Sequence, residues 1–145
     1  MITSAIAVTV VAAVVAVIVL LRQRFVVVQV IGVSMEPVLR AGQRVLVRRA
    51  GVRTVRRGDL VVFALASVQL KQPGDPPWMV KRAVALSGDP IPHESVPPAL
   101  GVDGAHVPEG HLIVRGDNPA ASFDSRQAGF VDGAALLGVV VRTLA

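Results

Sequence analysis

The sequence Leu20-Leu-Arg-Gln-Arg-Phe-Val-Val-Val-Gln-Val-Ile31 decides the fold, because two different kinds of apolar sequence meet within it. Before it, residues 1–21 are mostly apolar and contain no charged side chain. About 20 such residues are enough to cross the ~30 Å hydrocarbon core of a bilayer as a helix. After Arg24 the run is β-branched, which favours a strand. The sequence therefore predicts a transmembrane anchor over residues 1–24 and a separate domain over residues 25–145.

A cleaved signal peptide is the alternative interpretation of the N-terminal segment. However, no basic residue precedes the apolar run, and residues 5–21 exceed the about 7–15 apolar residues that a signal peptide usually has. Arg22 and Arg24 end the run at a membrane interface. The positive-inside rule would keep both arginines, and the domain that follows them, in the cytoplasm.

Short β-rich runs separated by Gly-Asp, Pro-Gly and Pro-Pro pairs follow the anchor, and such a pattern is typical of an antiparallel sheet. The runs are residues 25–31, 45–47, 60–63, 79–86, 111–114 and 139–141. Residues 87–110 hold five prolines and are expected to form a loop or insertion outside the core. The predicted fold is mostly β: a single N-terminal transmembrane helix followed by a compact antiparallel β-domain.

Composition narrows the possible chemistry. The chain has no cysteine, which excludes disulfides, a thiol nucleophile and thiolate zinc sites. Its net charge of +5 suggests an anionic partner, and with only 3% aromatic residues anionic lipid is favoured over nucleic acid. The three histidines, which have no metal-ligand spacing, are interpreted as surface residues: His93, His106 and His111. Neither a metal nor a cofactor is predicted.

The first segment with reactive groups is Gly32-Val-Ser-Met-Glu-Pro37. A serine between a strand and a proline sits on a tight, exposed turn, where its hydroxyl and its own backbone N–H can face one small volume. The alternative is a turn serine that hydrogen-bonds its own backbone. Ser34 is therefore a candidate nucleophile whose role depends on a neighbouring base.

Lys81 is the candidate base. Strand alternation would place it on the same face as three apolar side chains, Met79, Ala83 and Ala85, with Arg82 pointing the other way. Desolvation among such neighbours lowers the pKa of a lysine, and a neutral lysine can act as a general base. A lysine that extends to solvent from a strand end is the alternative.

The third segment is Gly116-Asp-Asn-Pro-Ala-Ala-Ser-Phe-Asp-Ser-Arg126, which is dense in hydrogen-bonding groups. Asp124 and Arg126 could form a pair that braces the turn. The alternative is a polar surface loop with an Asx-turn at Asp117.

Four motifs in this order resemble the serine/lysine signal peptidase I family over residues 26–131. They are Ser34-Met-x-Pro37, Arg57-Gly-Asp-Leu-Val-Val-Phe63, Val80-Lys-Arg82 with Gly88-Asp89 downstream, and Gly116-Asp-Asn-x-x-x-Ser-x-Asp-Ser-Arg126. The resemblance implies a signal peptidase-type β-domain and gives each matching residue a role. Ser34 would be the nucleophile with its own N–H as oxyanion donor, Lys81 the general base and Ser122 the hydroxyl that orients the lysine. Structural support would come from Asp117, Asp124 and Arg126.

Some positions depart from the family pattern. Gly32 stands where some members carry a Ser or Thr that supplies a second oxyanion donor, so the second donor stays open. Ala85 and Ser87 replace a Gly and a Pro that are frequent there, and Pro119 and Ala120 replace charged or polar residues.

The implied function is a membrane-bound serine endopeptidase that removes signal peptides from secretory precursors. It would be single-pass in the cell membrane, with its domain on the extracytoplasmic side, because a large C-terminal domain can translocate despite flanking charge. Three alternatives remain: a dedicated protease for one precursor, a catalytically silent membrane-anchored peptide-binding β-module, and a cytoplasmic self-cleaving serine/lysine regulator. Trp78 is assigned either to the membrane interface or to the core, and the oligomeric state is open.

Overall fold

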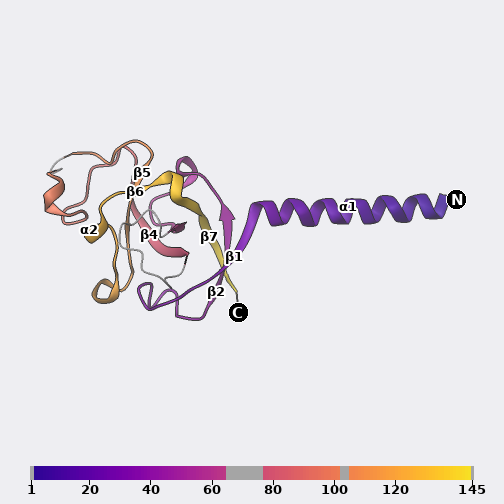
Figure 1. Cartoon of the computed structure of the whole chain (residues 1–145), viewed down its shortest axis with the longest axis horizontal. Coiled ribbons are helices and arrows are strands. Elements are labelled where there is room, and N and C mark those ends of the chain that lie inside the picture. Colours follow the sequence, from indigo (N-terminus) through magenta and orange to yellow (C-terminus); the bar gives the residue numbers. More distant parts are fainter. Residues whose placement is uncertain (1, 65–76, 102–104, 145) are drawn as a thin grey trace.

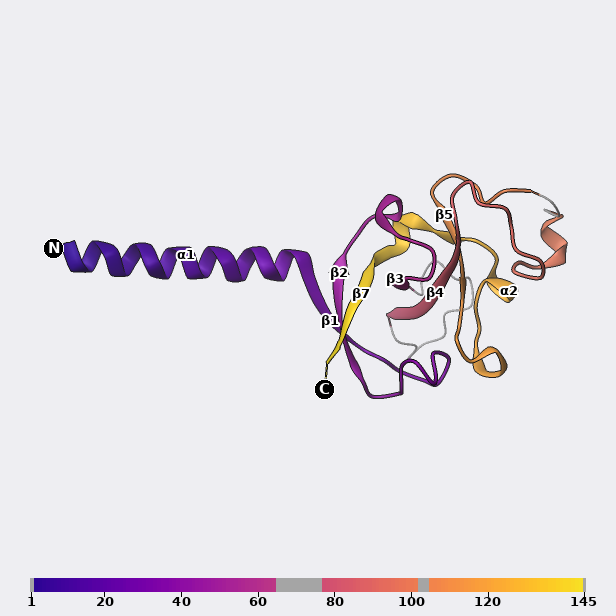
Figure 2. The same ribbon diagram turned by 180° about the vertical axis from the view of Figure 1, so that it is seen from behind.

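The structure, a computed structural model, describes residues 2–64, 77–101 and 105–144. Helix α1 (Ile2–Arg24) stands clear of a β-domain that begins directly at Phe25, as the two opposite views show (Figures 1 and 2). The helix is long and apolar enough to cross a membrane, and none of its apolar span is buried against the domain. Its 23 residues correspond to about 34 Å of α-helix.

The strands form one antiparallel sheet in the order β1-β2-β7-β3-β4-β5-β6. They are β1 (Phe25–Gln29), β2 (Arg44–Arg49), β3 (Leu60–Ala64), β4 (Trp78–Leu86), β5 (His111–Arg115), β6 (Val131–Asp132) and β7 (Leu136–Leu144). Each predicted run overlaps one of these strands, although the run 25–31 extends two residues beyond the end of β1, and the mostly-β fold class is confirmed. The two-residue strand β6 and the one-turn helix α2 (Ser125–Ala128) were not predicted from the sequence.

Both faces of the central strands are covered, which explains why their sequences are continuously apolar rather than alternating. In β3, Val62 belongs to one core cluster, whereas its neighbours Val61 and Phe63 belong to another. The first cluster also contains residues of β1, β2 and the segment between them: Val28, Val30, Met35, Leu39, Val45 and Val47. Trp78 is half-buried against this first cluster, which supports its assignment to the core.

Strict alternation along β4 fails after Ala83. The register with β5 shifts between Ala83 and Ala85, as in a β-bulge, which inserts an unpaired residue and changes the facing of those that follow. Ala85 consequently packs in a third cluster with Val107 and Ile113, whereas Ala83 packs in the second. The prediction that Ala85 shares the apolar surroundings of Lys81 was therefore wrong.

The proline-rich segment is partly a core element, contrary to the sequence-based expectation. It holds a 3-10 turn (Pro98–Leu100), but Val107 is only 2% exposed and completes the third cluster. His93 and His106 are exposed as expected. His111 is half-buried because its ring lies edge-on against Phe130, with 6.2 Å between the ring centroids.

Candidate active site

Ser34 lies in the turn that connects β1 to β2. Apolar side chains on either side hold this turn to the domain: Met35 is 1% exposed and Leu39 is 2% exposed, both in the first core cluster. The Leu39 N–H donates to the Met35 carbonyl at 2.9 Å, and Gly32 adopts a φ of +82°, which favours glycine. The turn therefore presents the half-exposed Ser34 from a fixed backbone.

Asn118 holds the same turn from the opposite side of the site. Its backbone N–H donates to the Ser34 carbonyl at 2.9 Å, and its side-chain amide donates to the Val33 carbonyl at 3.1 Å. Asn118 was quoted in the sequence motif but not assigned a role. The sequence did not predict this contact, because Asn118 and Ser34 lie far apart along the chain.

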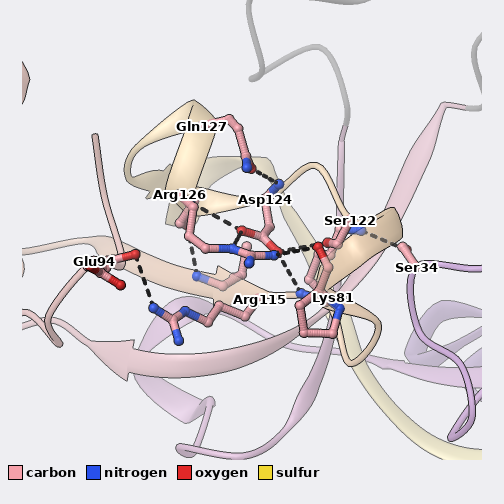
Figure 3. Close-up of polar contacts among 12 residues, drawn as sticks. Ser34, Lys81, Glu94, Arg115, Ser122, Asp124, Arg126 and Gln127 are labelled. Atoms are coloured by element: carbon pink, nitrogen blue, oxygen red, sulfur yellow. Dashed lines mark hydrogen bonds and ion pairs between the residues drawn. The ribbon is translucent and has the colours of Figure 1, made fainter. Parts of the chain in front are cut away.

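Lys81 reaches Ser34 from β4. Its Nζ atom lies 2.7 Å from the Ser34 Oγ atom and donates to it in the charged form (Figure 3). The side chain is almost entirely buried, with 2% of the residue exposed. Burial is the main reason that the pKa of Lys81 falls from its usual 10.5 to about 8; Asp124 opposes this shift and Arg126 adds to it. Near pH 8 about half of the amines are therefore neutral, with a lone pair available to accept the Ser34 proton.

Ser122 lies beside this pair but bonds elsewhere. Its hydroxyl donates to Asp124 Oδ2 at 2.7 Å, and within the described residues no hydrogen bond joins it to Lys81 (Figure 3). Gly116 allows Ser122 and the backbone of Ser34 to approach each other closely. A Cβ atom on Gly116 would lie 2.2 Å from Ser122 Oγ and 2.7 Å from the Ser34 carbonyl oxygen. Only a residue without a side chain fits between them.

Asp124 organises the loop after β5. The Arg126 guanidinium donates to both of its carboxylate oxygens at 2.9 Å, so the expected pair is present. The carboxylate also accepts the Gly116 N–H at 2.9 Å and caps helix α2. Burial alone would raise the pKa of Asp124, but the bonds from Arg126, Gly116 and Ser122 outweigh it and lower the pKa to about 2. A carboxylate that is 3% exposed therefore stays charged beside the site.

Arg82 supplies a support that the sequence analysis left out of the site. Its guanidinium forms two hydrogen bonds to the Asp117 carboxylate, at 2.7 and 2.6 Å, and a third to the Gly58 carbonyl at 2.8 Å. The bond to Asp117 is the main reason that the pKa of Arg82 is raised. This fork ties β4, the turn before β3 and the loop after β5 together on the side of β4 away from Lys81. The predicted Asx-turn alternative does not account for Asp117.

The backbone N–H of Ser34 donates to no other residue in the described part of the chain. It is thus available to a substrate oxygen beside the hydroxyl. Residues 2–64, 77–101 and 105–144 contain no group of three His, Asp or Glu side chains that could hold a metal ion. The arrangement is a hydroxyl and a desolvated amine in contact, with a free N–H donor beside them.

Comparisons with known proteins point to one family. The sequence profile described as "Signal peptidase, peptidase S26" matches residues 2–96 and 94–144. The chain is 30% identical over 123 residues to a Synechocystis protein named "Probable signal peptidase I-2", covering 72% of this chain and 56% of the relative. It is 34% identical over 101 residues to mouse "Mitochondrial inner membrane protease subunit 1", covering 68% of this chain and 56% of the relative.

A third relative, "Mitochondrial ATP-independent inner membrane protease subunit 1a" from Arabidopsis thaliana, is 40% identical over 80 residues, or 50% of this chain and 47% of that protein. The matches thus span about half the length of the curated relatives. Since the family profile covers nearly the whole chain, with the motifs around Ser34, Lys81 and Asp124 inside it, the chain belongs to the signal peptidase family, peptidase S26.

Proposed function

We propose that this protein is a membrane-anchored serine endopeptidase that removes signal peptides from secretory precursors, with Ser34 as nucleophile and Lys81 as general base. The observation that carries the proposal is the 2.7 Å contact between Lys81 Nζ and Ser34 Oγ in a buried setting. A weak nucleophile in contact with an adjacent base is the arrangement that covalent catalysis by serine requires. The presence of both groups argues against the catalytically silent peptide-binding module.

The reaction follows from this geometry. Neutral Lys81 takes the Ser34 proton while Oγ bonds to the carbonyl carbon of the scissile peptide. The Ser34 N–H stabilises the resulting oxyanion. The ammonium of Lys81 then protonates the leaving amine as the C–N bond breaks, which leaves an ester on Ser34. Water, deprotonated by Lys81, attacks this ester and releases the new carboxyl end together with the serine hydroxyl.

Supporting roles are proposed for the neighbouring groups. The Ser122 hydroxyl donates its hydrogen bond to Asp124, so its oxygen lone pairs can accept a hydrogen bond from the Lys81 amine during the reaction. Asp124 and Arg126 fix Ser122, and Asp117 fixes the loop through Arg82. In the resting state described here, Ser122 bonds Asp124 and Lys81 bonds Ser34, so Ser122 would orient the lysine only during the reaction.

Helix α1 would span the cell membrane and hold the domain on the extracytoplasmic side, where a precursor still bound by its apolar segment exposes its cleavage site. The precursor would bind in an extended conformation, with small side chains at the cleavage site. Expectations from the positive-inside rule oppose this orientation, since Arg22 and Arg24 follow the helix. Protease added to intact cells should degrade the domain; complete protection would show the opposite orientation.

The direct test is incubation of the detergent-solubilised full chain with a labelled secretory precursor. Cleavage at the signal-peptide junction supports the proposal, and an uncleaved precursor contradicts it. A panel of unrelated precursors separates a general enzyme from a dedicated one. The alternative of a protease dedicated to one precursor is tested in this way because relatives of this chain bear the name of a mitochondrial inner membrane protease subunit.

The rate of cleavage should rise with pH through a midpoint near 8. The sign follows from the base: only neutral Lys81 accepts a proton, and its pKa is lowered to about 8 mainly by burial. The profile of kcat/KM against pH gives this midpoint directly. A midpoint near 6.5, the usual value for histidine, would indicate a histidine base instead.

Gly116→Ala should lower kcat by about 10–100-fold, because the new methyl group would collide with Ser122 Oγ and the Ser34 carbonyl, and displacements near 1 Å carry costs of this size. Gly51→Ala is the matched control: nothing lies within 4 Å of its added methyl group, and its φ is −86°. Wild-type kcat in Gly116→Ala would show that the close approach is not needed for catalysis.

A further inference from the structure

The backbone N–H that would stabilise the oxyanion belongs to the peptide unit between Val33 and Ser34. This unit contains the Val33 carbonyl as well as the Ser34 N–H, and its peptide bond is trans. Because a trans peptide unit is planar, its N–H and its C=O point in opposite directions. The contacts that hold the Val33 carbonyl therefore also set the direction of the Ser34 N–H.

Two donors hold the Val33 carbonyl. The Glu36 N–H closes a tight turn onto it at 3.1 Å, and the side-chain amide of Asn118 donates to it at 3.1 Å from the loop after β5. Only the NH₂ end of the Asn118 amide can face a carbonyl oxygen, so chemistry settles which way the amide points. Hydrogen bonds to a carbonyl also polarise the peptide unit, which makes its N–H a stronger donor.

Asn118 also holds the peptide unit on the other side of Ser34. Its backbone N–H donates to the Ser34 carbonyl at 2.9 Å, so the carbonyls before and after the serine both accept from the same residue. The side chain of Val33 adds little support, because it is 43% exposed. The direction of the Ser34 N–H thus depends on hydrogen bonds to the backbone and not on packing of Val33.

The backbone of Asn118 is itself fixed. The preceding residue, Asp117, accepts two hydrogen bonds from Arg82, at 2.7 and 2.6 Å. The carbonyl of Asn118 accepts the last N–H of the 3-10 turn Pro119–Ala121 at 3.1 Å. The loop therefore presents the Asn118 amide to the Ser34 turn from a braced position.

We infer that Asn118 is a positioning residue of the peptidase: its side-chain amide fixes the plane of the Val33–Ser34 peptide unit, so that the Ser34 N–H points at the oxyanion as the oxyanion forms. The inference rests on the proposed function. A hydrogen bond weakens steeply as its donor turns away from the acceptor. Loss of one oxyanion donor lowers the rate about 10²–10³-fold, and a donor that is present but free to turn should have a smaller effect.

Asn118→Ala should lower kcat for a labelled precursor about 10–100-fold and change KM by less than about threefold, because the oxyanion exists in the transition state and not in the bound substrate. Asn118→Asp keeps the shape but turns an oxygen towards the Val33 carbonyl, so its loss should be at least as large. Gln43→Ala is the matched control. The Gln43 amide also braces the β1–β2 connection, by accepting the Arg40 N–H at 2.8 Å, and its removal should leave kcat unchanged.

The pH profile separates a misdirected N–H from a displaced catalytic pair. The substitution of Asn118 leaves Lys81 Nζ and Ser34 Oγ in contact, so the midpoint of kcat/KM against pH should stay near 8 in Asn118→Ala. A midpoint that moves by about one pH unit or more would show that Asn118 acts on the serine and lysine themselves, and would overturn the inference.

A peptide aldehyde with the substrate sequence tests the donor directly. Ser34 Oγ adds to the aldehyde carbon, and the serine proton passes through Lys81 to the former carbonyl oxygen, which takes the place of the oxyanion. The inhibition constant of the aldehyde should rise in Asn118→Ala by the factor by which kcat falls. The corresponding peptide alcohol cannot form this bond, so its inhibition constant should not change. Equal losses of affinity for both compounds would overturn the inference.

Wild-type kcat in Asn118→Ala, or an equal loss in Gln43→Ala, would also overturn the inference. Urea unfolding shows whether each variant is folded. If Asn118→Ala is unfolded, the isosteric Asn118→Asp decides the question, and unfolding of both would show a structural role only. A wild-type chain that neither cleaves the precursor nor binds the aldehyde would refute the peptidase and this inference together, whereas equal cleavage by wild type and variants would refute this inference alone.

Discussion

Ser34→Ala should lower the rate of precursor cleavage by about 10³–10⁶-fold, because it removes the hydroxyl oxygen that would form the ester, as expected from the loss of a serine nucleophile elsewhere. Lys81→Met should cause a similar loss, since the hydroxyl then has no base. The two losses should not add in the double variant, because the two groups act as a unit. The measurement is single-turnover cleavage of a labelled precursor. Activity above one tenth of wild type in either variant would show that Ser34 and Lys81 are not the catalytic pair.

Lys81→Met also separates loss of chemistry from loss of folding. In the folded chain the pKa of Lys81 is about 8, compared with 10.5 when unfolded, so below pH 8 the fold contains a charged amine in a buried site. The corresponding cost to folding is on the order of 3 kcal/mol at pH 7. Methionine fills a similar volume without charge, so the variant should be inactive yet more stable than wild type by this order.

The sign of the pH dependence provides the check. Between about pH 8 and 10.5 the unfolded chain binds more protons at Lys81 than the folded chain, so wild-type stability should rise with pH across this window. The stability of Lys81→Met should not show this rise, so the difference in stability between the variant and wild type should become smaller as the pH increases. Urea unfolding at pH 7 and pH 10 measures both. A methionine variant less stable than wild type at pH 7 would contradict the account of a desolvated lysine.

Asp124→Asn is expected to have the largest effect on stability, with a loss of about 3–5 kcal/mol in the free energy of unfolding. The amide keeps the shape of the side chain but leaves the Arg126 guanidinium without its carboxylate and presents an NH₂ group to donors. Cleavage should fall as well, because Ser122 loses the acceptor that fixes it. Chemical denaturation and kcat are measured on the same preparation.

Asp132→Asn is the matched control, because Asp132 also caps a short helical turn through its side chain but is exposed and forms no ion pair among the described residues. Asparagine caps almost as well, so the control should change stability by less than about 0.5 kcal/mol. Wild-type stability should in turn fall as the pH drops from about 4 towards 2, where Asp124 becomes protonated. Equal losses of stability in the two variants would show that the buried pair of Asp124 and Arg126 stabilises the fold no more than an exposed helix cap does.

Local sequence patterns were sufficient for the elements of the fold. The β-branched run at Phe25 and the apolar run at Leu60 predicted strands that the structure contains. The position of β7 between β2 and β3 was not predictable, since strand order depends on packing between segments far apart in the chain. The shift that turns Ala85 away from its expected face also escaped prediction, because residues 83–86 are all apolar and a change of face leaves no mark in such a run.

The site was predictable where a motif supplied the partner. Alternation on β4 correctly gave a buried Lys81 and a half-exposed Arg82, and the spacing of Asp124 and Arg126 suggested their pair. The contacts of Asn118 with the Ser34 turn, and of Arg82 with Asp117, join segments 35 to 85 residues apart. Hydrogen bonds of this kind follow from the tertiary structure, so the sequence could supply the residues but not their partners.

The central claim is that a neutral amine at position 81 activates the hydroxyl at position 34, and one titration tests it. The chain has only two lysines, so selective ¹⁵N-lysine labelling gives two side-chain NMR signals, which Lys71→Arg assigns. The account predicts that the Lys81 Nζ signal titrates with a midpoint near pH 8 and that this signal responds to Ser34→Ala. A midpoint at the usual 10.5, with no response to Ser34→Ala, would contradict the claim.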